Sequence, residues 1–186
     1  MRAQADRMRA IIDDLLSLSR LEQEEGSAPR DPVDAGTLLA RVREQALPLR
    51  KAGQVLELEL GTKARLLGNE DELYSAVSNL VANALAYTPE HGRVTIRFEA
   101  DADGARISVI DTGIGIPAEQ IPRITERFYR VDGGRARETG GTGLGLAIVK
   151  HALQRHDAHL EIESAVGKGS TFTAVFPRGR VGFITL

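Results

Sequence analysis

Two glycine-rich turns constrain this chain more than any other feature of its sequence. The first, Asp111-Thr-Gly-Ile-Gly-Ile-Pro117, follows an apolar run, and the second, Gly140-Gly-Thr-Gly-Leu-Gly145, leads into one. Glycine backbone can approach phosphate oxygens closely, and a carboxylate beside a tight turn can accept a hydrogen bond from an exocyclic amine. Either motif alone could be a simple turn. Together they predict a nucleotide site with separate adenine and phosphate ends.

Composition narrows the class of protein. Hydrophobic residues make up 42% and charged residues 27% of the chain, which is typical of a soluble globular protein. The formal net charge of -2 argues against nucleic-acid binding driven by positive charge. The lack of cysteine excludes disulfides, zinc–thiolate sites and cysteine nucleophiles. No apolar run approaches the roughly 20 residues that span a bilayer, so we expect a cytoplasmic segment without membrane contact.

The first 25 residues are predicted to form an amphipathic helix. Its apolar side chains recur every three or four residues and make one stripe: Met8, Ile11, Ile12, Leu15, Leu18 and Leu21. A single helix cannot bury such a stripe by itself. The stripe therefore packs either on the globular body of this chain or in a helical bundle, of which a dimeric one is the sharper hypothesis.

The rest of the chain alternates between helical and strand periodicity. The stretch Gly26-Ser-Ala-Pro-Arg-Asp-Pro32 predicts a linker over residues 26–36. Beyond it we expect helices over 37–51, 69–87, 119–124 and 144–154, and strands over 54–60, 64–67, 93–100, 106–111, 159–164 and 170–176. Asn69 can cap the second of these helices, with Glu72 placed as in a capping box. This order predicts a two-layer α/β sandwich with a mixed, largely antiparallel sheet.

Two asparagines are candidate metal ligands. Asn79 and Asn83 lie four residues apart on a predicted helix, so both side chains project from one face. An amide oxygen suits Mg²⁺, which takes its other ligands from water and substrate phosphates. Each could equally be an ordinary polar residue on a solvated face. The apolar neighbours Leu80 and Val81 favour the functional interpretation, because they place this helix against the core.

The turns themselves also have plainer explanations. Asp111 ends an apolar strand, where an acid is commonly a turn former. Two glycines and Pro117 after it impose more constraint than a simple hairpin needs. The second turn enters a helix whose free backbone amides would favour phosphate oxygens. Neither a Walker A sequence nor a Rossmann fingerprint is present, because Gly167-Lys168 is followed by Gly169 and no suitable βαβ unit surrounds the glycines.

Taken together, these motifs resemble those of a known protein family. The order of the Asn79/Asn83 helix, Asp111-x-Gly-x-Gly, Phe128 and Gly141-x-Gly-Leu-Gly145 resembles the ATP-binding catalytic domain of sensor histidine kinases. The resemblance implies the Bergerat-type ATP-binding fold, shared with the gyrase, Hsp90 and MutL ATPases, in which helices cover one face of a mixed sheet. The stretch Ile124-Thr-Glu-Arg-Phe-Tyr-Arg-Val-Asp132 looks most like the phosphate-regulon sensor kinases.

The resemblance also implies residue roles, with ATP and Mg²⁺ as cofactors. Asp111 would accept a hydrogen bond from the adenine amino group, and Asn83, assisted by Asn79, would bind Mg²⁺. Residues 130–141 would form a mobile lid whose Arg130 and Arg137 contact phosphate. The complete implied nucleotide-contacting set is Asn83, Tyr87, Asp111, Gly113, Gly115, Ile116, Phe128, Gly141, Thr142, Gly143, Leu144, Gly145 and Ser170. One departure is Ala86, where many of these kinases have a lysine, so one phosphate contact is missing or supplied by a lid arginine.

The type of residue at position 79 favours a kinase over an ATP hydrolase. The related ATPases resemble one another in placing an acid four residues before the magnesium-binding asparagine, as the general base for water. Asn79 holds that position here, and an amide cannot take a proton from water at useful rates. We therefore expect slow hydrolysis and transfer of the γ-phosphoryl group to another acceptor.

The acceptor is expected outside this chain. In the family it is a histidine on the first helix of a dimeric bundle, and none of His91, His151, His156 and His159 has the matching context, so each is expected on a turn or a surface. Residues 1–21 resemble the second bundle helix, as does the run Leu18-Ser-Arg-Leu-Glu22 that closes it. We therefore divide the chain into a bundle helix (1–25), a linker (26–36), a catalytic domain (37–180) and a tail (181–186). Expected partners are the phosphoacceptor helix, a second copy in the parent homodimer and a response-regulator receiver domain, with the parent anchored in the bacterial inner membrane.

Other functions stay open at this stage. A gyrase/Hsp90-like ATPase clamp conflicts with Asn79 in place of an acid. A serine kinase of the anti-sigma-factor type is disfavoured by the N-terminal helix and the Phe128 stretch. A degenerate ATP-binding scaffold is kept open by Ala86.

Overall fold

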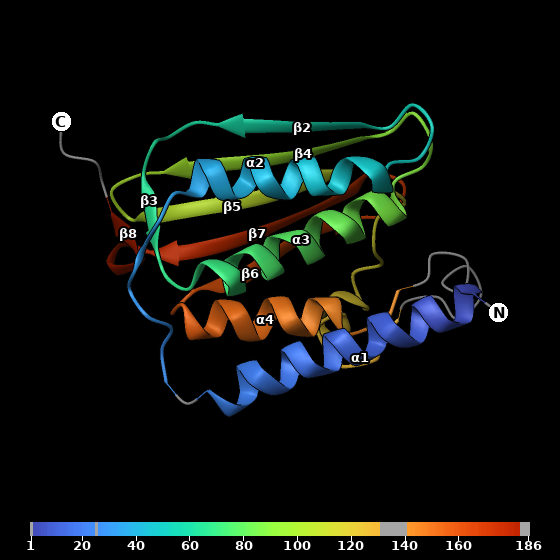
Figure 1. Cartoon of the computed structure of the whole chain (residues 1–186). Coiled ribbons are helices and arrows are strands. Elements are labelled where there is room, and N and C mark those ends of the chain that lie inside the picture. The colour runs from blue at the N-terminus through green and yellow to red at the C-terminus, as the bar shows by residue number, and fades with distance from the viewer. Residues whose placement is uncertain (1, 25, 131–140, 183–186) are drawn as a thin grey trace.

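The computed structural model describes residues 2–24, 26–130 and 141–182, and it forms two layers. Its helices are α1 (Arg2–Gln23), α2 (Ala35–Ala46), α3 (Glu70–Tyr87) and α4 (Gly145–Arg155), with 3-10 turns η1 (Leu47–Leu49), η2 (Ile121–Arg123) and η4 (Arg178–Arg180). Its strands are β1 (Pro32–Val33), β2 (Val55–Leu60), β3 (Arg65–Leu67), β4 (Arg93–Ala100), β5 (Gly104–Asp111), β6 (His159–Ala165), β7 (Gly169–Pro177) and β8 (Val181–Gly182). Figure 1 shows α2, α3 and α4 side by side over one face of the main sheet.

The main sheet has five strands in the order β2-β4-β5-β7-β6. The β2–β4 pair is parallel and the other pairs are antiparallel, so the expected mixed α/β sandwich is confirmed. The β5–β7 register places Asp111 opposite Ser170. Fully buried Val94, Ile96 and Ile107 form the helix-facing side of the sheet. The register therefore fixes the end of β5 against β7 before any ligand is considered.

The N-terminus of α3 differs from the expected capping box. Asn69 Oδ1 accepts the Glu72 N–H at 3.1 Å, as predicted. Glu72 does not reach back to Asn69, because its carboxylate accepts two hydrogen bonds from Arg155 Nε, at 3.0 and 3.1 Å. The backbone N–H of Asn69 instead donates to Nε2 of His156 at 3.0 Å. The start of α3 is thereby tied to the end of α4.

A second, three-stranded sheet has the order β1-β3-β8. Strand β1 falls within residues 26–36, which were expected to be a linker, and Val181–Gly182 of the expected tail form β8. Arg180, which is fully buried, donates to the carbonyls of Ala28 and Pro29 at 3.0 Å. These contacts hold the segment after α1 against the α/β sandwich.

Helix α1 lies alongside α4, away from the main sheet (Figure 1). The single apolar stripe expected from its sequence divides into two parts. Leu18 is 2% exposed and packs on α4, whereas Met8, Ile12 and Leu15 remain exposed. No helix within the described ranges is both long and apolar enough to cross a bilayer.

Two helix boundaries also differ from expectation. Helix α2 begins after Asp34, whose carboxylate accepts the Thr37 N–H at 2.8 Å, but it ends at Ala46 and continues only as η1, because Pro48 lacks a backbone donor. The helix expected over residues 119–124 is reduced to η2. The expected lid, apart from Arg130 and Gly141, lies outside the described residues.

Candidate nucleotide site

One end of the candidate site is built around Asp111, the last residue of β5. Its side chain is buried, and Oδ1 accepts the backbone N–H of Gly113 at 2.8 Å and that of Ser170 at 3.3 Å. Oδ2 makes no hydrogen bond to any described residue. One oxygen is thus fixed by the backbone, and the other is available to a donor from a ligand.

Burial raises the pKa of Asp111, and the hydrogen bonds from Gly113 and Ser170 oppose that rise. Oδ2 is not sealed from solvent, so a hydrogen-bond donor of a ligand can reach it and replace its hydrogen bond to water. The local chemistry therefore favours a ligand that brings an N–H group.

The turn after Asp111 is held too closely for side chains. A Cβ on Gly113 would lie 2.6 Å from both Asp111 Oδ1 and the Tyr87 carbonyl oxygen. Gly115 has φ of +72°, and a Cβ there would lie 2.0 Å from the carbonyl oxygen of Ala165. The glycines predicted from the motif are thus required by packing against the end of α3 and the β6–β7 turn.

Ser164 belongs to this end of the site but was not predicted. Its hydroxyl accepts the Ile116 N–H at 2.8 Å and lies 2.9 Å from the Ser170 hydroxyl. The pairing of Ser164 with Ser170 in the β6–β7 register brings them together. The only signal for it in the sequence was the position of Ser164 and Ser170 on either side of a predicted hairpin.

Helix α3 presents Asn79, Asn83 and Tyr87 at four-residue intervals, so all three lie on one side of the helix. Asn79 Nδ2 donates to the Ser75 carbonyl at 2.9 Å, and its Oδ1 lies 2.7 Å from where a Cβ on Gly145 would be. The half-buried Asn83 amide makes no hydrogen bond to a described residue. Its oxygen is therefore available to a ligand, while that of Asn79 faces the start of α4.

The second glycine-rich turn contacts the segment around Phe128. Gly143 has φ of +78°, and a Cβ there would lie 2.9 Å from Phe128 Cα. The Phe128 N–H donates to the Gly143 carbonyl at 2.9 Å, while the Phe128 ring is 59% exposed. Arg130 Nη1 donates to the Gly141 carbonyl at 2.7 Å, so the two ends of the expected lid are joined. Arg137 lies outside the described residues.

The start of α4 leaves backbone donors available. Leu144, its N-cap residue, provides no side-chain cap, and the first backbone bond inside the helix runs from the Ile148 N–H to the Leu144 carbonyl at 3.0 Å. The first amides of a helix lack partners within it, and the positive end of the helix attracts anions. This end of the site is suited to phosphate, as the sequence predicted.

Comparison with known proteins identifies the family. A model of the Histidine kinase-, DNA gyrase B-, and HSP90-like ATPase family matches residues 68–180. The chain belongs to this family. The matched region contains all predicted site residues, from Asn79 on α3 through both glycine-rich turns to Ser170 on β7.

Within this family, the similar curated proteins are sensor histidine kinases. The phosphate regulon sensor protein PhoR of Pseudomonas aeruginosa is 51% identical over 183 residues, which is 97% of this chain and 41% of that protein. Sensor histidine kinase RppB of Synechocystis is 45% identical, covering 94% and 39%. The chain thus spans about two fifths of these relatives, and the expected resemblance to phosphate-regulon sensors is confirmed.

Solved histidine kinase structures share the fold. The mycobacterial sensor histidine kinase MprB matches with a TM-score of 0.69 and 30% identity, over 80% of this chain and 97% of that chain. Full-length ShkA, solved in complex with AMPPNP, matches with a TM-score of 0.83 and 28% identity, over 100% of this chain and 38% of that chain. The chain therefore carries the ATPase-like catalytic domain of the histidine kinase family.

One histidine differs from expectation for this histidine kinase domain. His156 was expected on a surface but is fully buried at the end of α4, where Nδ1 contacts the Ala152 carbonyl at 2.7 Å and Nε2 accepts the Asn69 N–H. Burial lowers its pKa, with Arg180 and Arg155 contributing to that lowering. This pattern fits a neutral ring that donates through Nδ1 and accepts through Nε2, which is a structural role.

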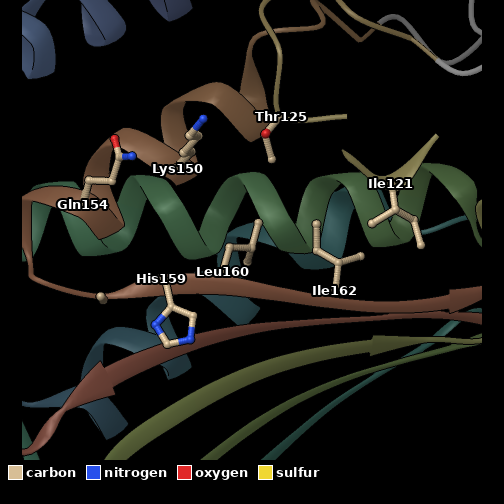
Figure 2. Close-up of a pocket in the computed structure, with 8 residues that line it drawn as sticks. Ile121, Thr125, Lys150, Gln154, His159, Leu160 and Ile162 are labelled. Atoms are coloured by element: carbon tan, nitrogen blue, oxygen red, sulfur yellow. The ribbon is translucent and has the colours of Figure 1, made fainter. Parts of the chain in front are cut away.

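A cavity of about 360 Å³ lies apart from these residues, between η2, α4 and β6. Figure 2 shows Leu160 and Ile162 pointing into it from β6, with Lys150 and Gln154 on the α4 side. It includes none of the residues that the sequence predicts for nucleotide binding, so it does not belong to the candidate nucleotide site of the histidine kinase domain.

Proposed function

We propose that this chain binds Mg-ATP and donates the γ-phosphoryl group to a histidine on a dimerisation helix outside the chain. The observation that carries this proposal is the pair of unpaired ligand groups on one surface. Asp111 Oδ2 and the Asn83 amide both lack protein partners among the described residues, although both side chains are at least half-buried. Neither group is sealed from solvent, so a ligand can reach both and replace their hydrogen bonds to water with its own.

The groups present fit ATP and Mg²⁺ by their chemistry. Asp111 would accept from the adenine amino group, and the amides at the start of α4 would receive phosphate oxygens. Within the described ranges, no cluster of three His, Cys, Asp or Glu side chains could hold a metal. Mg²⁺ would therefore depend on Asn83, assisted by Asn79, together with phosphate and water oxygens. When bound, it would neutralise charge on the transferred phosphoryl group.

Asn79 supports phosphoryl transfer to a protein acceptor over hydrolysis. Its amide nitrogen is engaged with Ser75, and an amide cannot serve as the base that water attack requires. We further propose that residues 1–25 are the second helix of a dimeric bundle and 37–180 the catalytic domain. In the parent protein, a receiver domain would accept the phosphoryl group in phosphate-type signalling, and a membrane anchor would hold the kinase.

The binding step can be tested by calorimetry with Mg²⁺ and a non-hydrolysable ATP analogue. The wild type should bind, and Asp111→Asn should bind far more weakly, because an amide nitrogen can then face the adenine amino group without accepting from it. Equal binding by the two proteins would contradict the assignment of the adenine end.

The transfer step requires labelled ATP. The chain should phosphorylate a separately supplied dimeric bundle that carries the acceptor histidine, yet form no acid-labile phosphohistidine on itself. Asn79→Ala should leave no large ATPase activity to lose. Fast Mg²⁺-dependent hydrolysis that this substitution abolishes would instead favour an ATPase.

A further inference from the structure

Helix α1 places a carboxylate directly on the second glycine-rich turn. The Thr142 hydroxyl donates to Asp14 Oδ2 at 2.6 Å and accepts the Leu144 N–H at 3.1 Å. Leu144 is the N-cap residue of α4. Asp14 is therefore connected through one hydroxyl to the helix end that would receive the phosphates, where negative charge is stabilised.

The rest of the docked face of α1 holds Asp14 in this position. Leu18 is buried against Leu144, Ala147 and Ile148 of the turn and α4. Four residues further along, Glu22 forms an ion pair with Arg127. Asp14, Leu18 and Glu22 are spaced by four residues, so one face of α1 makes all three contacts.

We propose that Asp14 acts as an intramolecular competitor of the triphosphate, so that docking of α1 weakens binding of ATP. This inference rests on the proposed nucleotide site. A carboxylate and a polyphosphate repel each other, and a half-buried pair of charges is screened less than one in bulk water. Burial also raises the pKa of Asp14, while the hydrogen bond from Thr142 opposes that rise. The donor that Asp14 uses is the Thr142 hydroxyl, which lies at the turn where phosphate oxygens would bind.

The competition should depend on the phosphates and not on the base. Asp14 contacts Thr142, whereas Asp111 and Ser170 form the opposite end of the site through the β5–β7 register. Adenosine should therefore bind independently of α1, and a triphosphate should not. Because coupling between two binding events is reciprocal, the triphosphate should also weaken the docking of α1.

The first test is calorimetry on the whole chain at neutral pH, with Mg²⁺ and either a non-hydrolysable ATP analogue or adenosine. Asp14→Asn should tighten binding of the analogue by about fivefold or more, the lower range of measured couplings, and leave adenosine unchanged. The matched control is Asp13→Asn, which removes the same charge from the exposed neighbouring position and should stay within about twofold of wild type.

Three outcomes would overturn the inference. Unchanged affinity of Asp14→Asn for the analogue would remove the competition while leaving the proposed function intact. Weaker affinity would make Asp14 a partner of the metal or the phosphates. Absence of analogue binding by both wild type and Asp14→Asn would overturn the proposed function itself.

A second test undocks the helix without changing Asp14. Leu18 belongs to a small cluster separate from the main core, so Leu18→Ser should release α1 and leave the α/β sandwich folded. Leu18→Ser should tighten binding of the analogue. Adding Asp14→Asn to it should give little further gain, because both changes remove the same interaction, the contact of Asp14 with the turn. Additive gains would contradict the mechanism. Backbone hydrogen exchange of residues 8–22 should also rise with the analogue and not with adenosine.

Discussion

The adenine and phosphate ends of the proposed site are constructed in opposite ways. At the adenine end, Asp111 is 6% exposed, and a side chain on Gly115 would meet backbone at 2.0 Å. At the phosphate end, Gly141 is exposed, and among the described residues the nearest neighbour of a Cβ there would be Arg130, at 3.9 Å. The first end is formed by sheet register before a ligand arrives. The second is formed by turns, a helix end and a docked helix.

This difference assigns separate tasks to the two ends. A packed site with fixed hydrogen-bonding groups discriminates well, because a wrong ligand leaves buried groups unpaired. An open site of backbone amides binds any suitably placed anion and can be shared by competitors such as Asp14. We therefore expect Asp111 to determine which base binds, and Thr142 to be the point at which Asp14 regulates nucleotide binding.

The largest effect should come from Asp111→Asn, the change that most directly tests the packed end. Loss of a charge-assisted hydrogen bond, with the adenine amino group left unpaired, should weaken nucleotide binding on the order of 100-fold. Because burial raises the pKa of Asp111, its ionisation opposes folding, so the variant should unfold at a higher temperature than wild type at pH 7.

That gain in melting temperature should shrink as the pH falls through the raised pKa of folded Asp111, and it should vanish below about 3.9, where the carboxyl group is neutral in both states. Calorimetric binding and thermal melts across pH measure the two effects. A variant that binds normally, or that melts earlier at pH 7, would contradict the account of the adenine end.

The next largest effect should come from adding one methyl group at each end of the site. Gly115→Ala and Gly141→Ala then compare how closely the two ends are packed. Gly115→Ala combines a left-handed φ with a backbone clash and should cost about 2–3 kcal/mol of unfolding free energy. Gly141→Ala enters open space and should change that free energy by less than about 0.5 kcal/mol. Urea unfolding of both variants checks the contrast, and equal costs would mean that the ends are equally packed.

A smaller effect distinguishes the two ends of α4. Its start is uncapped by a side chain, whereas its end is fixed by neutral His156. Since burial lowers the pKa of His156, the unfolded chain binds a proton that the folded chain does not, and stability should fall as pH drops below about 6.5. His156→Gln should cost about 1 kcal/mol at pH 8 and show a weaker loss on acidification.

The matched control for that change is His159→Gln, because His159 is exposed on β6. Its unfolding free energy should follow the wild-type pH profile. An unaltered profile in His156→Gln would show that another group is responsible.

The smallest expected effect concerns Ala86, the position where the family resemblance leads us to expect a lysine. Lys51 Nζ already donates to the carbonyls of Ala86 and Thr88, at 2.6 and 2.8 Å, so this ammonium serves the end of α3. Ala86→Lys would add a cation and should tighten binding of the ATP analogue by about two- to fivefold, without affecting adenosine. A gain for both ligands would place the new charge away from the phosphates.

The sequence predicted the elements that depend on local periodicity and turn chemistry. Asn69 caps α3 as expected, and the glycines at 113 and 115 are required by close packing. It failed where partners lie far along the chain. Glu72 pairs with Arg155 and not with its own helix, and buried His156 accepts a hydrogen bond from Asn69, 87 positions away. No local pattern encodes such contacts, because they arise only when α3 and α4 pack.

Two arginines, Arg180 and Arg155, have a mechanical consequence for the docked helix. Arg180 fixes Ala28 and Pro29, while Arg155 bonds to the carbonyls of Glu24 and Gly26, at 2.6 and 3.3 Å. Any swing of α1 must therefore pivot within the few residues between Gln23 and Ala28 and first break the bonds of Arg155. The 22 residues of α1 form a lever about 33 Å long, so a turn of about 10° at this pivot would carry its far end roughly 6 Å.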